Sequence, residues 1–419
     1  MTTPPPALAR RLGLSDAVII GLGSMLGAGV FAAFSPAAAS AGGLLLFSLV
    51  LAALLAWVNA WSSARLAALY PQSGGTYVYG RERLGPFWGY LAGWAFVVGK
   101  TASCAAMAMT VGAYLWPDQS RLVAVATVLL LVAINLGGVQ KSAGMTRVLV
   151  VITLLALVAF VGLAARDALA GDGTAQALLG SAPATGWAGV LQGAGFFFFA
   201  FAGYARIATL GEEVRDPART IPRAILAALG IVLVIYALVA VALITGFGAS
   251  WIADHSAPLA AAADTFGVPG FGAAMRAAAT VAAVGSLLGV ILGVSRTTLA
   301  MARDRYLPGT LAAVHPRTQV PHHAEIAVGV VVIAVVLVAD LRGAIGFSSF
   351  CVLTYYAIAN ASAVTLPGAT WARVVAAIGV IACLLVAWLL PWTSVLGGAI
   401  VLTVGIIVYV VRRAMLAGG

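Results

Sequence analysis

The chain contains twelve apolar stretches, each about as long as a bilayer is thick. They cover residues 15–39, 44–68, 86–115, 122–140, 143–166, 187–214, 223–247, 271–302, 323–340, 343–364, 371–390 and 394–414. A helix of about 20 apolar residues crosses the roughly 30 Å hydrocarbon core of a membrane. Only 9% of the 419 residues are charged, whereas about a quarter of the residues in soluble domains are charged. The sequence therefore predicts an all-α, polytopic membrane protein with twelve transmembrane helices.

The basic residues predict the orientation of these helices. If the N-terminus is cytoplasmic, sixteen of the 23 lysines and arginines flank the spans on the inner side and four on the outer side. Because cytoplasmic loops are enriched in lysine and arginine, we expect a cell-membrane protein with both termini in the cytoplasm, residues 1–14 among them. This bias and the attraction to anionic lipids account for the net charge of +10 without a nucleic-acid partner. The first residues, MTTPPPALARR, lack the apolar core of a signal peptide, so we expect the first span to be retained.

Cysteine and histidine give no sign of a metal or cofactor site. The three cysteines fall inside predicted spans, where cysteine is typically a small apolar side chain. The four histidines are predicted to lie in loops. His322, His323 and Glu325 lack the spacing of zinc ligands, and we expect them in a solvated loop.

The stretch GLGSMLGAG, residues 21–29, places four glycines in the middle of the first span. Each glycine costs a helix about 1 kcal/mol relative to alanine. Gly23 and Gly27 have the four-residue spacing of close helix packing, but that pattern accounts for only two of the four. The glycine spacing of a dinucleotide loop is absent, and no strand precedes the stretch. We therefore expect a broken helix whose free carbonyl and N–H groups face a polar cavity.

A second span carries a matching interruption. In FFFFAFAGYARIATLGEEVRDPARTIPRAI, residues 196–225, Gly203 lies inside a run that is otherwise predicted to be helical. The run begins five spans after the first interrupted one, as expected for a transporter built from two inverted repeats. We expect these repeats over residues 15–168 and 186–365, followed by two further helices over 370–415. The opposed ends of two broken helices suit a molecule that carries both a carboxylate and an ammonium group, such as an amino acid.

Four long motifs carry a resemblance to a known family. They are GLGSMLGAGVF in the first span, YPQSGGTYVYGRERLGPFWGYLAGW at 70–94, the 196–225 segment, and SRTTLAMARDRYLPGTLAAVHPRTQVPHHAEI at 295–326. In this order the chain resembles the amino acid–polyamine–organocation (APC) permeases with the leucine-transporter fold. The last two spans resemble that family only in number and hydropathy.

The resemblance implies alternating access around a central site formed by the unwound parts of spans 1 and 6. It implies that the substrate carboxylate is bound by the backbone of Ser24, Met25, Gly27, Ala28 and Gly29. It implies that the amino group is bound by carbonyls around Ile20, Gly21, Phe199, Ala200 and Ala202. Gly203 and Tyr204 are further expected substrate-binding residues. Phe199 matches the aromatic position that covers the substrate in related permeases; the alternative is that these phenylalanines only pack in the core or against lipid.

Two positions depart from the pattern of related permeases. Many of them have a glutamate where this chain has Ala205, next to Arg206. Some proton-dependent relatives have a lysine in helix 5 at the position of a sodium ion in sodium-coupled ones. The aligned residue here is Thr153.

The interior charges are the candidate coupling residues. Lys100 lies near the centre of the third span, where a charge costs about 2.5 to 3.5 kcal/mol. It is either a group that gains and loses a proton or a fixed charge bonded to the helix breaks. Arg206 stays charged, so it could attract a carboxylate, pair with Glu212 or Glu213, or replace a coupling cation. Arg296 is expected to extend toward the inner membrane surface.

Together these features predict a secondary transporter for a small amino acid, driven by protons or by exchange. Three interior cations and no interior acid favour a neutral or acidic substrate. The alternative is a permease for amines, polyamines or other organic cations. An enzyme is less consistent with spans that carry no catalytic group, and a channel is less consistent with two matched breaks. A sensor or scaffold protein could share the fold, and only the absence of substrate flux would reveal it. The oligomeric state is expected to be a monomer or a dimer.

Overall fold

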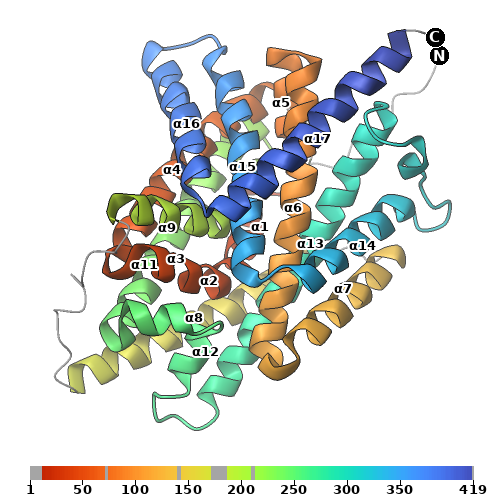
Figure 1. Cartoon of the computed structure of the whole chain (residues 1–419). Helices are drawn as coiled ribbons and strands as arrows, with labels where there is room; N and C mark the ends of the chain where they lie inside the picture. Colours follow the sequence, from red (N-terminus) through yellow and green to blue (C-terminus); the bar gives the residue numbers. More distant parts are fainter. Residues whose placement is uncertain (1–11, 71–73, 139–142, 171–185, 209–212, 418–419) are drawn as a thin grey trace.

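The computed structural model describes residues 12–70, 74–138, 143–170, 186–208 and 213–417. Its secondary structure is helical throughout this part, apart from one isolated bridge (Figure 1). The first half holds α1 (Leu14–Met25), α2 (Ala28–Ala32), α3 (Phe34–Ala41), α4 (Leu45–Leu69), α5 (Thr76–Leu84), α6 (Pro86–Leu115), α7 (Ser120–Leu136) and α8 (Ala143–Ala170). The second half holds α9 (Gly186–Phe201), α10 (Ala205–Ala208), α11 (Pro217–Asp254), α12 (Pro258–Ala263), α13 (Phe271–Arg303), α14 (His322–Val338), α15 (Leu341–Val364), α16 (Thr370–Leu389) and α17 (Trp392–Ala417). Short 3₁₀ turns are η1 (Gly42–Leu44), η2 (Pro117–Gln119), η4 (Ala202–Tyr204) and η5 (Gly309–Ala312).

The predicted membrane architecture is confirmed. In the described part of the chain, eleven helical stretches are long and apolar enough to cross a bilayer. The ninth predicted span is α14, which has 17 residues and is therefore at the short end of the range for a spanning helix. The short α5 and α12 lie between spans and were not predicted.

The first predicted span is divided into three helices. It comprises α1, α2 and α3, and it ends where Gly42 adopts a φ of 54°. This left-handed conformation costs glycine little, because glycine has no Cβ atom. After η1 the chain continues as α4. By length and apolar character, α1 and α2 fall in one stretch, Leu14–Ala32, and α3 and α4 fall in the next, Phe34–Leu69.

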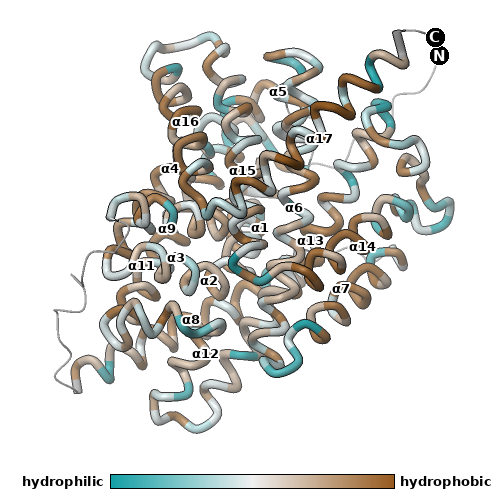
Figure 2. The backbone as a smooth tube through the Cα atoms, viewed as in Figure 1, coloured by the Kyte–Doolittle hydropathy of each residue, from teal (hydrophilic) through white to brown (hydrophobic). Residues whose placement is uncertain are grey.

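Two helices form the centre of the bundle. Both α6 and α15 are largely buried, and they pack against each other, while α6 also packs along α13 (Figure 1). The most hydrophobic residues lie on peripheral helices such as α14, α16 and α17 (Figure 2). The central helices carry more small and polar residues, as expected where helices pack against one another rather than against lipid.

The segment before α1 is joined to the loop after α10. Leu12 donates its N–H to the Glu213 carbonyl at 3.0 Å, and its own carbonyl accepts the N–H of Arg215 at 2.9 Å. These bonds connect the beginning of the first span to the segment that follows the sixth.

Candidate substrate-binding site between the two helix breaks

The first span is interrupted at Leu26 and Gly27. The helix α1 ends at Met25, Gly27 has a ψ of −123°, and α2 resumes at Ala28. No side chain caps the start of α2. The first N–H groups of a helix have no partner within it, so this start presents donors suited to an anion. The predicted interruption of span 1 is confirmed.

The sixth span is interrupted more mildly. After Phe201 the α-helix tightens into the 3₁₀ turn Ala202–Tyr204 and continues as α10. Gly203 lies at the centre of this turn, as predicted. A change of helix type frees fewer backbone groups than a full unwinding does.

The two interruptions are in direct contact. A Cβ atom on Gly203 would lie 2.5 Å from the carbonyl oxygen of Ser24 and 2.8 Å from the nitrogen of Met25. A Cβ atom on Gly29 would lie 2.7 Å from the Cα of Ala200. Real Cβ contacts are not this short, so both positions require glycine for the backbones to approach.

The carbonyl groups at the end of α1 are bound by two side chains that the sequence did not single out. Tyr236, on α11, donates its hydroxyl to the Met25 carbonyl at 2.6 Å. Ser286, on α13, donates to the Gly23 carbonyl at 3.0 Å. Both lie within long apolar runs, where a lone tyrosine or serine resembles an ordinary core residue. The break is therefore held by α11 and α13.

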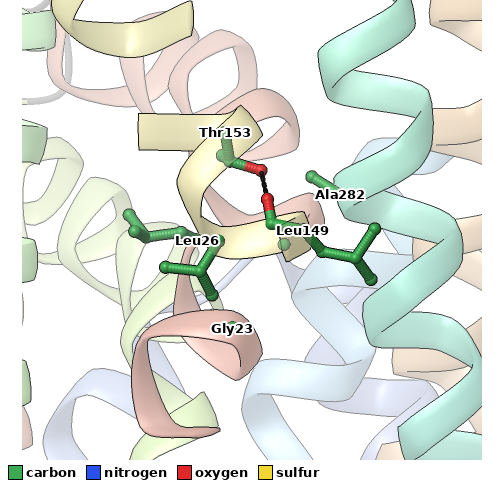
Figure 3. Close-up of a pocket in the computed structure, with 7 residues that line it drawn as sticks. Gly23, Leu26, Leu149, Thr153 and Ala282 are labelled. Atoms are coloured by element: carbon green, nitrogen blue, oxygen red, sulfur yellow. Dashed lines mark hydrogen bonds between the residues drawn. The ribbon is translucent and has the colours of Figure 1, made fainter. Parts of the chain in front are cut away.

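A small cavity of about 10 Å³ lies beside the first break. Its walls are Gly23, Leu26 and Gly27 of the first span, Leu149, Val150 and Thr153 of α8, and Ala282 of α13 (Figure 3). A water molecule needs about this much space. The Thr153 hydroxyl is bonded to the Leu149 carbonyl at 2.9 Å, so it is not directed at the break (Figure 3).

The phenylalanines before the second break are buried. Phe199 is 9% exposed, and the three phenylalanines before it are fully buried. Phe197 packs edge-on against Phe34 at 5.2 Å between ring centroids, and Phe198 packs against Tyr356 at 5.7 Å. None of the four faces lipid. Tyr204 is also fully buried, 5.5 Å from the ring of Tyr356.

The structure brings most of the implied site residues together. Met25, Ala28, Gly29, Ala200 and Ala202 are buried around the contact between the breaks. Gly21 lies further along α1, where a Cβ atom would be 2.3 Å from Ile207 of α10. Ile20 accepts the Ser24 hydroxyl at 3.0 Å. The residues thus form one contact zone among α1, α2, α9 and α10.

The candidate coupling residues lie on two different helices, α6 and α10. Lys100 is half-buried in α6, and no described residue accepts a hydrogen bond from its Nζ. Arg206 lies on α10, where it interacts electrostatically with Glu213 and Arg296. Glu212, the other predicted partner of Arg206, lies outside the described residues.

The predicted loop at 322–325 is wrong. His322 and His323 begin α14, and Glu325 lies within its first turns with an exposed fraction of 0%. The interior therefore contains an acid, contrary to the expectation from the sequence. The prediction failed because His322, His323 and Pro321 look like a polar turn, whereas proline before a helix start is compatible with helix formation.

Comparisons with known proteins agree with a transporter. A family model described as amino acid permease matches residues 16–416. An uncharacterised transporter of Mycobacterium tuberculosis is 61% identical over 98% of this chain and 92% of its own length. The vacuolar cationic amino acid transporter 4 of Arabidopsis thaliana is 28% identical over 80% of this chain and 60% of its own length. The branched-chain amino acid permease of Bacillus subtilis is 25% identical over 77% of this chain and 73% of its own length.

Proposed function

This chain belongs to the amino acid permease family, and we propose that it is a secondary active transporter that moves a small amino acid across the cell membrane. The family and the names of the relatives indicate a transporter rather than an enzyme. We propose alternating access between two inverted five-helix repeats, with both termini in the cytoplasm. The basic residues on the side of the N-terminus support this orientation.

The contact between the two breaks carries the proposal. The free N–H groups at the start of α2 suit a carboxylate, and the carbonyl groups at the end of α1 suit an ammonium group. Tyr236 and Ser286 already donate hydrogen bonds to two of the carbonyls in α1. We propose that a substrate inserts between Gly203 and the Ser24–Met25 peptide and displaces part of this contact.

A neutral amino acid is the proposed substrate, with an acidic one as the next choice. Glycine, alanine, methionine and phenylalanine dominate the zone, and among its described residues there is no acid to hold a cationic side chain. The alternative class of substrate is a cationic amino acid or another organic cation. One observation favours it: the Arabidopsis relative is named a cationic amino acid transporter.

We propose that protons, or exchange of one amino acid for another, drive the transport. Lys100 and Arg206 are the proposed coupling residues. Lys100 can either change protonation or remain a fixed charge, whereas Arg206 stays charged and attracts the anionic part of the substrate. Thr153 contributes only a bonded hydroxyl to the small cavity, which gives a sodium ion few ligands there.

Counterflow into liposomes tests the function. Purified protein is reconstituted, and labelled L-alanine, L-leucine, L-glutamate and L-arginine are offered against the same unlabelled compounds inside. We expect saturable counterflow of L-alanine or L-leucine, and accumulation when a proton gradient is imposed. Strict dependence on a sodium gradient would contradict proton coupling. Single-channel currents without counterflow would contradict the carrier mechanism.

A further inference from the structure

Glu325 is an acid enclosed by three membrane helices. It lies on α14, and its exposed fraction is 0%. Glu325 lies in the first turn of α14, toward one end of that span. Acids within membrane spans are rare and typically mark ion or proton sites. The substrate zone described above does not use this group.

The two carboxyl oxygens have different partners on different helices. Asn135, at the end of α7, donates its Nδ2 to Oε1 at 2.5 Å. Ser295, on α13, donates its hydroxyl to Oε2. The helices approach closely here, because a Cβ atom on Gly329 of α14 would lie 2.8 Å from a methyl group of Val132 on α7. One carboxyl group therefore connects α7, α13 and α14.

Asn135 and Ser295 can each form a hydrogen bond with Glu325 whether its carboxyl group is protonated or ionised. A carboxylate only accepts hydrogen bonds, whereas a carboxylic acid must also donate one. The Oδ1 of Asn135 is buried and accepts no hydrogen bond from any described residue. Rotation of this amide by half a turn would present Oδ1 to a protonated Glu325, and the Ser295 hydroxyl can likewise donate or accept. A lysine or arginine partner would instead hold the acid in its charged form.

The surrounding charges are close but are not paired with Glu325. Within the described part of the chain, no basic nitrogen lies within 4.0 Å of its carboxyl group. Arg296 of α13 interacts with it electrostatically. On α6, Cys104 lies within electrostatic range of both Lys100 and Glu325. The other titratable groups nearby are His322 and His323 on α14 itself, since η5 and the facing turn of α7 carry none.

We infer that Glu325 is a proton-binding site, and that its proton is the coupling proton of the proposed amino acid transport; only the second part rests on that proposed function. The helix α13 connects Glu325 to the first helix break. Ser295 contacts Glu325, and Ser286, nine residues earlier or about 14 Å along a helix, binds the Gly23 carbonyl beside the first break. Proton uptake changes the bond between Glu325 and α13, and a shift of this helix changes the support of the break.

Infrared spectroscopy of the protein in lipid tests the proton site without any substrate. Wild type is titrated from alkaline to acid pH, and the carbonyl band of a buried, protonated carboxylic acid is followed. We expect a titrating band that is lost in Glu325→Gln and kept in the control Glu82→Gln, whose carboxylate is exposed on α5. Identical titrating bands in wild type and Glu325→Gln would overturn the proposal, as would the absence of such a band in wild type. If Glu325→Gln does not fold, Asn135→Leu serves instead, because it should shift the band while leaving the acid in place.

Transport by the same variants tests the coupling. The probe is whichever of the four labelled amino acids wild type exchanges fastest in the counterflow assay. We expect Glu325→Gln to lose at least 10-fold in proton-driven accumulation, to keep exchange, and to make exchange independent of pH. Unchanged accumulation, or accumulation driven by sodium alone, would overturn the coupling role. If wild type exchanges none of the four, the proposed function fails while the infrared result still decides the proton site.

Discussion

Gly203 lies directly against the peptide between Ser24 and Met25, so the interruptions of the first and sixth spans share one contact. The position of a Cβ atom on Gly203 is 2.6 Å from the Ser24 carbonyl carbon. Gly203 could not be replaced by a larger residue without separating α1 from η4.

Gly203→Ala should abolish or strongly reduce transport. The added methyl group collides with backbone atoms, which cannot rotate away as a side chain can. We expect at least a 10-fold loss of counterflow in liposomes. The control is Gly230→Ala on α11, where a Cβ atom meets nothing within 4 Å and alanine favours the helix by about 1 kcal/mol. Equal activity of the two variants would show that the contact is dispensable.

Tyr236→Phe should loosen the first break. The variant removes the hydrogen bond to the Met25 carbonyl and leaves that buried acceptor without this partner. We expect a loss of about 1 to 3 kcal/mol in stability, measured as a lower Tm in detergent, together with an altered affinity for substrate. Thr245→Val on the same helix is the control, because its hydroxyl bonds only to carbonyls of α11 itself. A Tm equal to that of wild type would contradict this role of Tyr236.

Lys100→Gln should separate the two roles proposed for this lysine. If Lys100 exchanges a proton, the variant loses proton-driven accumulation and keeps exchange. If Lys100 is a fixed charge, both activities fall together. The measurement is accumulation and counterflow in the same liposomes, with Arg121→Gln, at the start of α7, as the control for loss of one positive charge. Full accumulation by Lys100→Gln would remove the residue from the mechanism.

Asp16→Asn should favour opening between α1 and α8. Asp16 is paired with Arg147, an ion pair of which the arginine is 54% exposed. An exposed pair contributes at most about 1 kcal/mol, or about a 5-fold change in population. We expect maleimide to label Ala282→Cys, in the small cavity, up to about 5-fold faster in this background. The exchange of both charges, Asp16→Arg with Arg147→Asp, should restore the slow rate, and an unchanged rate in Asp16→Asn would argue against a gate here.

The pair of Asp264 and Arg276 should persist in mildly acid solution. The hydrogen bond to Arg276 holds the pKa of Asp264 below its usual 3.8. A lowered carboxyl pKa means that the stabilisation is complete above pH 3.8 and is lost as the pH falls through the lower value. Because both side chains are more than a third exposed, the effect should be at most about 1 kcal/mol. We expect Asp264→Asn to lower the Tm slightly at pH 7 and by less as the pH falls below 3.8; a difference that vanishes already at pH 5 would contradict the assignment.

The sequence was sufficient to predict the helical membrane fold and the place of both breaks. Span length and the glycines at 21–29 are local signals, and the structure shows the interruption at Leu26 and Gly27. The mildness of the second break was not predictable, since a 3₁₀ turn and an unwound segment can carry the same Gly203. The partners of the first break were also missed. Tyr236 is 211 residues from Met25 in sequence, and only the packing of α11 brings the two together.

The expectation that the interior contains no acid failed at Glu325. Next to two histidines and a proline it resembles a solvated turn, yet Asn135 and Ser295 enclose it. These partners come from positions 190 and 30 residues away, so no local pattern reveals them. The inference that a cationic substrate is disfavoured must therefore rest on the residues around the breaks and not on the interior as a whole.

The bridge at Leu12 has a mechanical consequence. Because both backbone groups of this residue are hydrogen-bonded to the segment at 213–215, the N-terminal end of α1 can move away from that segment only if both bonds break. In the proposed transport cycle, α1 and the segment after α10 must therefore either move together or first break this pairing. A cross-link between positions 12 and 214 would therefore preserve transport if the two segments move together. It would abolish transport if they must separate.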